Sequence, residues 1–495
     1  MKFGIYGAAG QTTCASRVGG LYHERVDAQT YADWGAEYLK YDNCGEVNVQ
    51  SYAKFSAMSD ALNATGKKIF FSYEPHLTEP IAWTQYVGNA WRTGHDIGSH
   101  FSSMFSDLAI NNAWATVGGV GGWNDADMLE VGNKGLTLSE QRAHFALWCL
   151  AKSPLLIGSD VRSINASSLA ILKNAGLIAV NQDSLGVQAA LYKAYPIGGA
   201  GGWSRRDVVA PTVAEPVQVP VGKKSFTGVT TCDFGYDVPA AQQAAFTSDG
   251  QIKLGAQCLL PHVKTGAPAL GACSDASSHW ELGISNETTA QIKIKSSNTC
   301  LKYIGGEEGT GLFLDACGTE PPICARTRCA SSTLSNELWY LTRHGQLIAS
   351  WTQVPIPPLE GHAPCSGWPC PDWNPPMCLA SSASQHPPAQ PPMPAGVPLP
   401  LPDISQCLQV WAGPLASKAS ELSHVVGLVN SCQNGSATIQ VDWSEIGLKL
   451  GKSQSCKVRD LYAGKDLGES KGGVSAQVGE HDIAVLRLSC PSSEE

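Results

Sequence analysis

The amino-acid sequence predicts an α/β fold, a (β/α)8 TIM-type barrel that lacks its first two βα units and is followed by an antiparallel β-domain. Segments typical of strands and helices alternate through residues 1–190, which favours a parallel sheet with crossover helices. Acidic residues recur where the predicted strands end, at the edge where such barrels keep their active sites. Residues 409–495 alternate apolar and polar side chains, as antiparallel strands do.

The barrel elements are predicted in order from local signals. Strands are expected at 2–6, 37–42, 67–74, 91–97, 121–129 and 153–160, and helices at 27–35, 49–66, 99–116, 137–150 and 167–176. Gly66 ends the second helix, and Thr137 with Glu140 forms a T-x-x-E capping box at the start of the fourth. The acids at the strand ends are Asp42, Glu74, Asp96, Asp127 and Asp160.

The number of βα units limits this interpretation. About six units are recognisable, whereas a closed barrel needs eight. The chain therefore reads as if it begins two units late, with strands 3–8 of the barrel in residues 1–190. A doubly wound open sheet is the competing fold. That fold normally carries a Gly-rich phosphate loop after an early strand, and "GAAGQT" at 7–12 is too weak a match to serve as one.

The rest of the chain divides by composition. The start of a β-domain, a cysteine-rich insertion and the remainder of the β-domain are predicted at 191–225, 226–408 and 409–495. A faint repeat runs through the insertion: a strand, a Cys-Leu pair, a second cysteine and a tryptophan recur from 250–282 to 290–320. Residues 354–403 hold 16 of the 30 prolines, which is typical of an extended segment.

Composition excludes several classes of protein. The 495 residues carry a net charge of −9 without a basic run, which argues against a nucleic-acid partner. No stretch approaches the ~18 apolar residues needed to cross a bilayer. Fourteen of the 17 cysteines follow residue 230 and four N-x-S/T sequons occur, so we expect disulfides and the secretory pathway, with an extracellular, vacuolar or lysosomal destination. No signal peptide opens the chain, and we expect that it was lost with the missing N-terminus.

Acids at strand ends suit acid–base chemistry on a sugar. Glycoside hydrolysis uses two carboxyl groups, one that attacks or activates water and one that protonates the leaving oxygen. No cysteine spacing makes a zinc site, and His95 and His100 are expected to be ordinary loop residues, so no metal is expected. The aromatic and basic residues that suit stacking on a sugar and bonding to its hydroxyls are Tyr6, Lys40, Trp91, Arg92 and Trp123.

Several long motifs occur in the order found in one enzyme family. The segment "KFGIYGAAGQTTCASRVGGLYHERVDAQTYADWGAEYLKYDNC" is followed by "GNAWRTGHDI", "GGWNDADMLEVGN", "AKSPLLIGSDVR" and "IAVNQDSLGVQ" across 1–188. "VWAGPL", "DWSEIGL" and "VRDLYAG" lie in 410–488. These motifs resemble the family 27 glycoside hydrolases, which are α-galactosidases and α-N-acetylgalactosaminidases. The resemblance implies a covalent galactosyl-enzyme, net retention and no cofactor.

The resemblance also implies roles for single residues. Asp42 matches the nucleophile, and a neighbouring Lys40 cation is expected to lower its pKa. Asp96 matches the general acid/base, whose pKa burial and a nearby carboxylate are expected to raise. Cys14 and Cys44 match a disulfide pair, and Asp125 is expected to be structural. The matches to substrate-binding positions are Tyr6, Cys14, Lys40, Glu74, Arg92, Asp127 and Met128.

Three features depart from the family pattern. The two missing βα units carry residues that bind the C4 and C6 hydroxyls. Tyr73 and Gly88 stand where some members carry the two cysteines of a disulfide, and Pro75 replaces a tryptophan next to Glu74. The insertion at 226–408 resembles a ricin-type β-trefoil, and both a sugar-binding and a structural role stay open for it. The disulfides expected in it are Cys258–Cys273 and Cys300–Cys317.

The leading functional hypothesis is an exo-acting α-galactosidase that cleaves terminal α-galactose from oligosaccharides, glycolipids or glycoproteins. A β-L-arabinopyranosidase or an α-N-acetylgalactosaminidase is the alternative within the family. A catalytically inert carbohydrate-binding protein is the alternative from another class. The sequence leaves the oligomeric state open, with a homodimer as one expectation.

Overall fold

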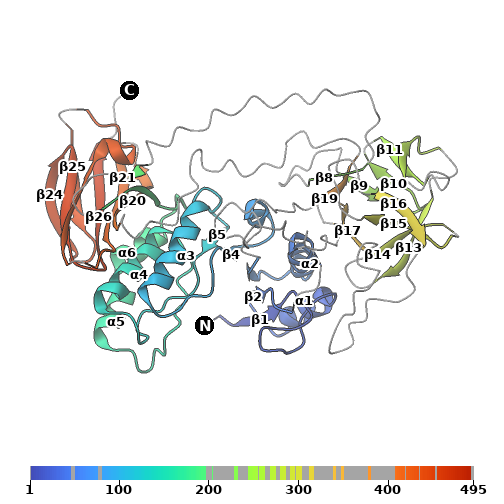
Figure 1. Ribbon diagram of the computed structural model, residues 1–495, viewed down its shortest axis with the longest axis horizontal. Helices are drawn as coiled ribbons and strands as arrows, with labels where there is room; N and C mark the ends of the chain where they lie inside the picture. Colours follow the sequence, from blue (N-terminus) through green and yellow to red (C-terminus); the bar gives the residue numbers. More distant parts are fainter. Residues whose placement is uncertain are drawn as a thin grey trace, which may run out of the picture. The chain divides into compact units, whose positions relative to one another are not determined.

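The computed structural model divides into two compact units, residues 1–89 with 217–390 and residues 90–216 with 391–495. Figure 1 labels helices and strands of both units. The described residues are 2–45, 49, 51–75, 81–196, 203–204, 228–231, 243–303, 312–316, 338–341, 347–349, 377–380 and 407–491, with short gaps inside 243–303 and after 418. None of the helices in these ranges has the length and hydrophobicity of a membrane span.

Three parallel strands with intervening helices open the first unit. The elements are β1 (Gly4–Ala8), α1 (Glu24–Asp33), β2 (Tyr38–Asp42), α2 (Ser51–Ala64), β3 (Phe70–Tyr73) and the 3-10 helix η1 (Ile81–Tyr86). β1 pairs in parallel with β2, and β2 with β3, so that Ala8 lies opposite Asp42 and Tyr41 opposite Tyr73. The carboxyl ends of these strands therefore meet at one edge of the sheet, as the sequence predicts.

Aromatic rings form the core behind these strand ends. The ring of Phe55 on α2 lies 4.8 Å from that of Tyr73 and 6.3 Å from that of Trp83, and Tyr41 meets Phe55 edge-on. All four side chains are buried. Burial of one such side chain contributes roughly 1.5–3 kcal/mol. The cluster therefore fixes the ends of β2 and β3, where the expected site residues begin.

The second unit starts with another parallel pair of strands and four helices. The elements are β4 (Ala90–Arg92), α3 (Phe101–Ala113), β5 (Trp123–Asp125), α4 (Leu138–Leu150), α5 (Ala166–Leu172) and α6 (Ala175–Asn181). Arg92 lies opposite Asp125 in the β4–β5 pair. The predicted capping box of α4 is present, because Thr137 Oγ1 accepts from the Glu140 amide and Glu140 Oε2 accepts from the Thr137 amide.

Two predicted elements of this unit are wrong. The apolar run 153–160 is no strand and makes one parallel bridge, from Ile157 to Leu129. Such short runs cannot be assigned from periodicity alone, and Pro154 lacks the N–H that a central strand donates. The helix expected at 167–176 is split into α5 and α6, because the Asn174 side chain accepts from the Leu177 amide and begins a new helix.

An antiparallel β-domain completes the second unit. Its elements are β6 (Ala190–Tyr195), β7 (Trp203–Ser204), β20 (Leu408–Lys418), β21 (Glu421–Asn430), β22 (Ala437–Asp442), η5 (Trp443–Ile446), β23 (Ser455–Asp460), β24 (Lys465–Lys471), β25 (Gly473–Val478) and β26 (Asp482–Pro491). Seven strands form one sheet in the order β24-β23-β26-β21-β20-β6-β7, and β22 pairs with β25. Two disulfides that sequence reasoning missed, Cys407–Cys432 and Cys456–Cys490, lie in its core.

The described strands of the insertion form two antiparallel sheets in the first unit. One sheet contains β9 (Ala244–Phe246), β10 (Ile252–Leu254), β11 (Gln257–Leu260) and β12 (Ala269–Gly271). The other contains β8 (Gly228–Thr231), β13 (Trp280–Ser285), β14 (Ala290–Ile294), β15 (Thr299–Tyr303), β16 (Leu312–Ala316), β17 (Leu338–Leu341), β18 (Leu347–Ala349) and β19 (Met377–Ala380). The trefoil assignment and the domain limits stay predictions.

The faint sequence repeat has a structural counterpart. The Trp280 indole N–H donates to the Leu259 carbonyl at 2.8 Å, and the Trp339 indole N–H donates to the Leu301 carbonyl at 3.1 Å. Each accepting leucine directly follows the cysteine of its repeat, so the two copies bury equivalent contacts.

Of the two disulfides expected in the insertion, Cys258–Cys273 is confirmed. Cys300 is disulfide-bonded. Cys317 lies outside the described residues, so its pairing with Cys300 stays a prediction.

Candidate active site

Asp42, the expected nucleophile, ends β2 with both carboxylate oxygens hydrogen-bonded. The Tyr6 hydroxyl on β1 donates to Oδ2 at 2.6 Å, and the Asn43 backbone N–H donates to Oδ1 at 2.7 Å. Burial, together with the bond to the carboxylate, raises the pKa of Tyr6 far above its usual value. Tyr6 therefore stays protonated and donates this bond to the Asp42 carboxylate.

A buried lysine that sequence reasoning missed supports this carboxylate from behind. Lys54 on α2 is 2% exposed, and its ammonium donates to Asn43 Oδ1 at 2.6 Å. Asn43 in turn presents its backbone N–H to Asp42. The lysine thus fixes the donor that holds Asp42. No motif marks Lys54, and only its place on a helix buried almost all round distinguishes it.

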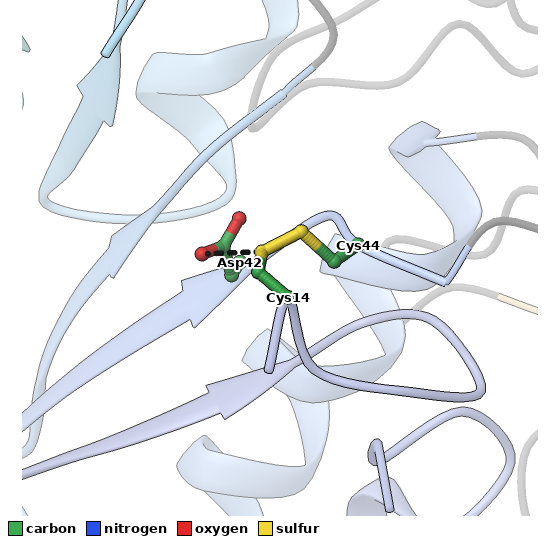
Figure 2. A group of neighbouring side chains, drawn as sticks. All are labelled: Cys14, Asp42 and Cys44. Atoms are coloured by element: carbon green, nitrogen blue, oxygen red, sulfur yellow. Dashed lines mark hydrogen bonds between the residues drawn. A yellow bond between two sulfur atoms is a disulfide. The ribbon is translucent and has the colours of Figure 1, made fainter. Parts of the chain in front are cut away.

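The predicted disulfide Cys14–Cys44 is present beside Asp42, as Figure 2 shows. Cys14 Sγ lies 3.3 Å from Asp42 Oδ2. A disulfide sulfur has no hydrogen to donate, so this is a packing contact. Ligand atoms of Cys14, Asp42 and Cys44 lie within 4.8 Å of one another. Metal ligation needs thiolates, and the disulfide uses both sulfurs, so the oxidised cluster is not a metal centre.

Lys40 pairs with a different acid from the one the sequence suggests. Its ammonium lies 2.8 Å from Glu74 Oε2, and both side chains are 21% exposed. Lys40 and Asp42 are two residues apart on β2 and so point to the same face of the sheet. Lys40 thus pairs with Glu74, and Lys54 reaches Asp42 through Asn43; the effect of Lys40 on Asp42 stays a prediction.

The two positions that depart together from the family pattern fit one another. The Tyr73 hydroxyl donates to the Thr84 carbonyl at 2.8 Å, and its ring is fully buried. A Cβ at Gly88 would lie 2.6 Å from Tyr73 Cε1. Tyr73 therefore occupies the space that a side chain at position 88 would need.

Arg92 organises the expected residues of the second unit. Its side chain is 5% exposed, and Nη2 donates to the His95 carbonyl at 2.6 Å and to Asp96 Oδ1 at 3.1 Å. Asp127 Oδ2 lies 3.1 Å from the same nitrogen. The Ile97 amide donates to that Asp127 oxygen at 2.9 Å. One buried cation thus joins Asp96 to Asp127.

Asp96 itself differs from the expectation. Its side chain is 89% exposed, so the predicted burial is wrong. β4 ends at Arg92, four residues earlier, which places Asp96 on a loop beyond the strand.

The remaining expected residues follow β5. Met128 is 41% exposed. Asp127 has a φ of +81°, and its amide donates to Asp125 Oδ1 at 2.9 Å, so Asp125 holds the turn that carries Asp127. His100 caps α3 by accepting from the Ser103 amide. Among the described residues, neither His100 nor His95 belongs to a metal-ligand cluster.

A third carboxyl group near Arg92 was missed. Asp107 on α3 is 1% exposed, and burial raises its pKa from 3.8 to about 7, although the Arg92 cation opposes the shift. The sequence holds one usable signal. Met104, Asp107, Leu108 and Asn111 follow the i, i+3, i+4, i+7 spacing of a buried helix face.

Comparison with known proteins places these two groups of residues in a family. Residues 1–183 match the family model of alpha galactosidase A, a melibiase model, and residues 405–488 match that of the alpha galactosidase C-terminal beta sandwich domain. An alpha-galactosidase of Oryza sativa subsp. japonica is 50% identical over 190 residues, 38% of this chain and 46% of the relative. Alpha-galactosidase 3 of Arabidopsis thaliana is 50% identical over 189 residues, 38% of this chain and 43% of the relative. The chain thus spans about half the length of these relatives.

Solved structures agree on the fold. The crystal structure of alpha-galactosidase I from Mortierella vinacea superposes with a TM-score of 0.53 at 19% identity, covering 99% of this chain and 76% of that one. The first matched segment holds Asp42, Arg92, Asp96 and Asp127, and the second holds strands β20 to β25 and most of β26. The two family-model matches, with relatives 50% identical over the first segment, identify the chain as a member of the melibiase family, glycoside hydrolase family 27.

Proposed function

We propose that the chain acts as a retaining exo-glycosidase that hydrolyses terminal α-D-galactosyl residues through a covalent glycosyl-aspartate. The observation that carries the proposal is Asp42 at the carboxyl end of β2, with its carboxylate fixed by donors from Tyr6 and Asn43. Relatives that are 50% identical over the matched segment are named alpha-galactosidases, which supports galactose as the sugar.

The proposed reaction has two displacement steps. In the first, a carboxylate oxygen of Asp42 attacks the anomeric carbon, the bond to the leaving oxygen breaks, and Asp96 gives that oxygen its proton. In the second, Asp96 takes a proton from water, which attacks the same carbon and releases Asp42. Two inversions give net retention. Neither step uses a metal or an organic cofactor.

The remaining expected residues take binding roles in this proposal. Lys40 and Glu74 form one ion pair at the strand ends of the first unit, and Arg92 and Asp127 form another in the second. Such paired groups present both donors and acceptors to sugar hydroxyls. Tyr6, Cys14 and Met128 supply surface against the ring.

A trapping experiment tests the nucleophile directly. A 5-fluoro galactosyl fluoride slows the second step, so mass spectrometry should find the sugar on the peptide that contains Asp42. We expect Asp42→Asn to lose both labelling and hydrolysis of nitrophenyl α-galactoside, while the exposed control Asp33→Asn keeps both. Labelling of another residue, or wild-type turnover by Asp42→Asn, would remove Asp42 as nucleophile.

The choice of sugar is tested by comparing three nitrophenyl substrates. We expect α-galactoside to be hydrolysed with a higher kcat/KM than β-L-arabinopyranoside or α-N-acetylgalactosaminide. A reversed order would assign one of the other family activities. Galactose binding without any hydrolysis would support the inert carbohydrate-binding alternative.

We also propose α-galactoside-bearing oligosaccharides, glycolipids or glycoproteins as substrates, and the secretory pathway as the compartment. Four disulfides in the described residues support an oxidising environment. Immunolocalisation with an organelle marker tests the compartment, and light scattering of the purified chain tests the expected homodimer.

A further inference from the structure

Helix α3 presents two polar residues to the loop that carries Asp96. Asn111 donates to Thr93 Oγ1 at 3.1 Å and accepts from the Gln188 side chain at 2.7 Å, so both ends of its amide are bonded. Asp107 lies one turn earlier on the same face. Neither of its carboxyl oxygens has a hydrogen bond of normal geometry, although the His95 backbone N–H faces it.

The Asp107 carboxyl lies directly against the loop backbone. A Cβ built on Gly94 would lie 2.6 Å from Asp107 Oδ1. A side chain at position 94 would displace the carboxyl group, so Asp107 packs against the backbone at Gly94. Asp107 therefore packs directly against the loop that carries Asp96, the expected acid/base.

The charges around Asp107 do not balance when all the acids are ionised. Arg92 faces it from β4, His95 and Asp96 face it from the loop, and Asp127 faces it from the segment after β5. One guanidinium then meets three carboxylates. Because Asp107 is the most buried of the three acids and Arg92 already serves Asp96 and Asp127, Asp107 is the group that carries a proton.

We propose that Asp107 is a positioning residue for the acid/base loop: as a neutral acid beneath Gly94 it leaves Arg92 bonded to Asp96 and Asp127, and its ionisation draws Arg92 away and frees the loop. The catalytic part of this inference rests on the proposed role of Asp96. The structural part is that the order of the loop depends on one buried proton, and it does not rest on the role of Asp96.

Hydrogen exchange without substrate tests the structural part. With a pKa of about 7, Asp107 is ~1% ionised at pH 5 and ~90% ionised at pH 8. We expect amides of residues 93–99 to exchange several-fold faster in wild type than in Asp107→Asn at pH 8, and equally fast at pH 5. Asp466→Asn, which removes an exposed aspartate on β24, should match wild type at both pH values.

Two exchange results would overturn the proposal. Equal exchange in wild type and Asp107→Asn at both pH values shows that ionisation does not reach the loop. Faster exchange in the variant at both pH values shows a packing role alone. If the asparagine variant does not fold, Asp107→Leu provides the same comparison, since it is also neutral at every pH.

The pH profile of hydrolysis tests the catalytic part. We expect kcat of wild type to fall above pH 7 and kcat of Asp107→Asn to hold to higher pH, with KM changed less than twofold. An unchanged alkaline limb in the variant overturns the link to catalysis. Absence of hydrolysis in wild type contradicts the proposed function and leaves the exchange experiment as the test of the loop.

Discussion

Replacing Asp107 with asparagine also measures what the buried carboxyl group costs above neutral pH. Its folded-state pKa of about 7 lies above the ordinary 3.8, so the folded chain binds this proton more tightly than the unfolded chain does. The corresponding stability is complete below about pH 4 and is lost as the pH rises through 7. A shift of about three units at ~1.4 kcal/mol each amounts to about 4 kcal/mol for this side chain, which is 1% exposed.

The unfolding of this part of the chain can be followed through Cys149. This free thiol is buried on α4 in the same core cluster as Met104 and Leu108 of α3. Urea titrations with a dipyridyl disulfide, which reacts at acidic pH, followed by peptide mass spectrometry, give the free energy of exposing it. The free energy of unfolding of the wild type, taken relative to that of Asp107→Asn, should fall by about 3 kcal/mol from pH 5 to pH 8.

Comparison at each pH cancels the effects that both proteins share. Asp466→Asn on the exposed surface of β24 serves as the matched control and should show a constant difference from wild type. A difference between wild type and Asp107→Asn that is the same at pH 5 and pH 8 would refute the reasoning, because it means that the carboxyl titrates alike in the folded and unfolded chains.

Three further changes have calculable outcomes. Tyr6→Phe removes a 2.6 Å bond to the proposed nucleophile, so kcat should fall roughly 10–100-fold with a small change in KM, measured with nitrophenyl α-galactoside. Gly88→Ala places a Cβ against the Tyr73 ring, so urea unfolding should show a loss of about 1–3 kcal/mol, partly restored by adding Tyr73→Leu. Replacing both Cys456 and Cys490 by serine opens a 34-residue loop and should cost about 4 kcal/mol in the β-domain.

Local signals predicted the elements that local interactions stabilise. The capping box at Thr137 formed as expected, because both of its hydrogen bonds lie within four residues. The run 153–160 did not form a strand, since its state depends on what lies beside it rather than on its own composition. The sequence repeat in the insertion corresponds to two equivalent tryptophan contacts, because equivalent sequences bury equivalent groups.

The candidate site was predictable where a residue lies at the end of a strand. Asp42 follows from strand-end chemistry, and the motifs name Asp96 and Arg92 at once. Lys54 and Asp107 stayed hidden because each is a single charged residue on a helix, where the usual expectation is a solvated surface. Their contacts lie on the loops that precede their helices, Asn43 for Lys54 and Gly94 for Asp107. The helical spacing around Asp107 indicates a buried face but not which group the face meets.

During synthesis, strand β6 is complete well before its partner β20. About 210 residues separate Tyr195 from Leu408, and ribosomes add roughly 5–20 residues per second, so β20 emerges about 10–40 s after β6. Throughout that interval the edge of β6 that will meet β20 has no native neighbour, and such edges recruit strands of other chains. Because of the insertion between them, the yield of folded β-domain depends on how well the cell prevents other chains from pairing with β6, a strand of six residues.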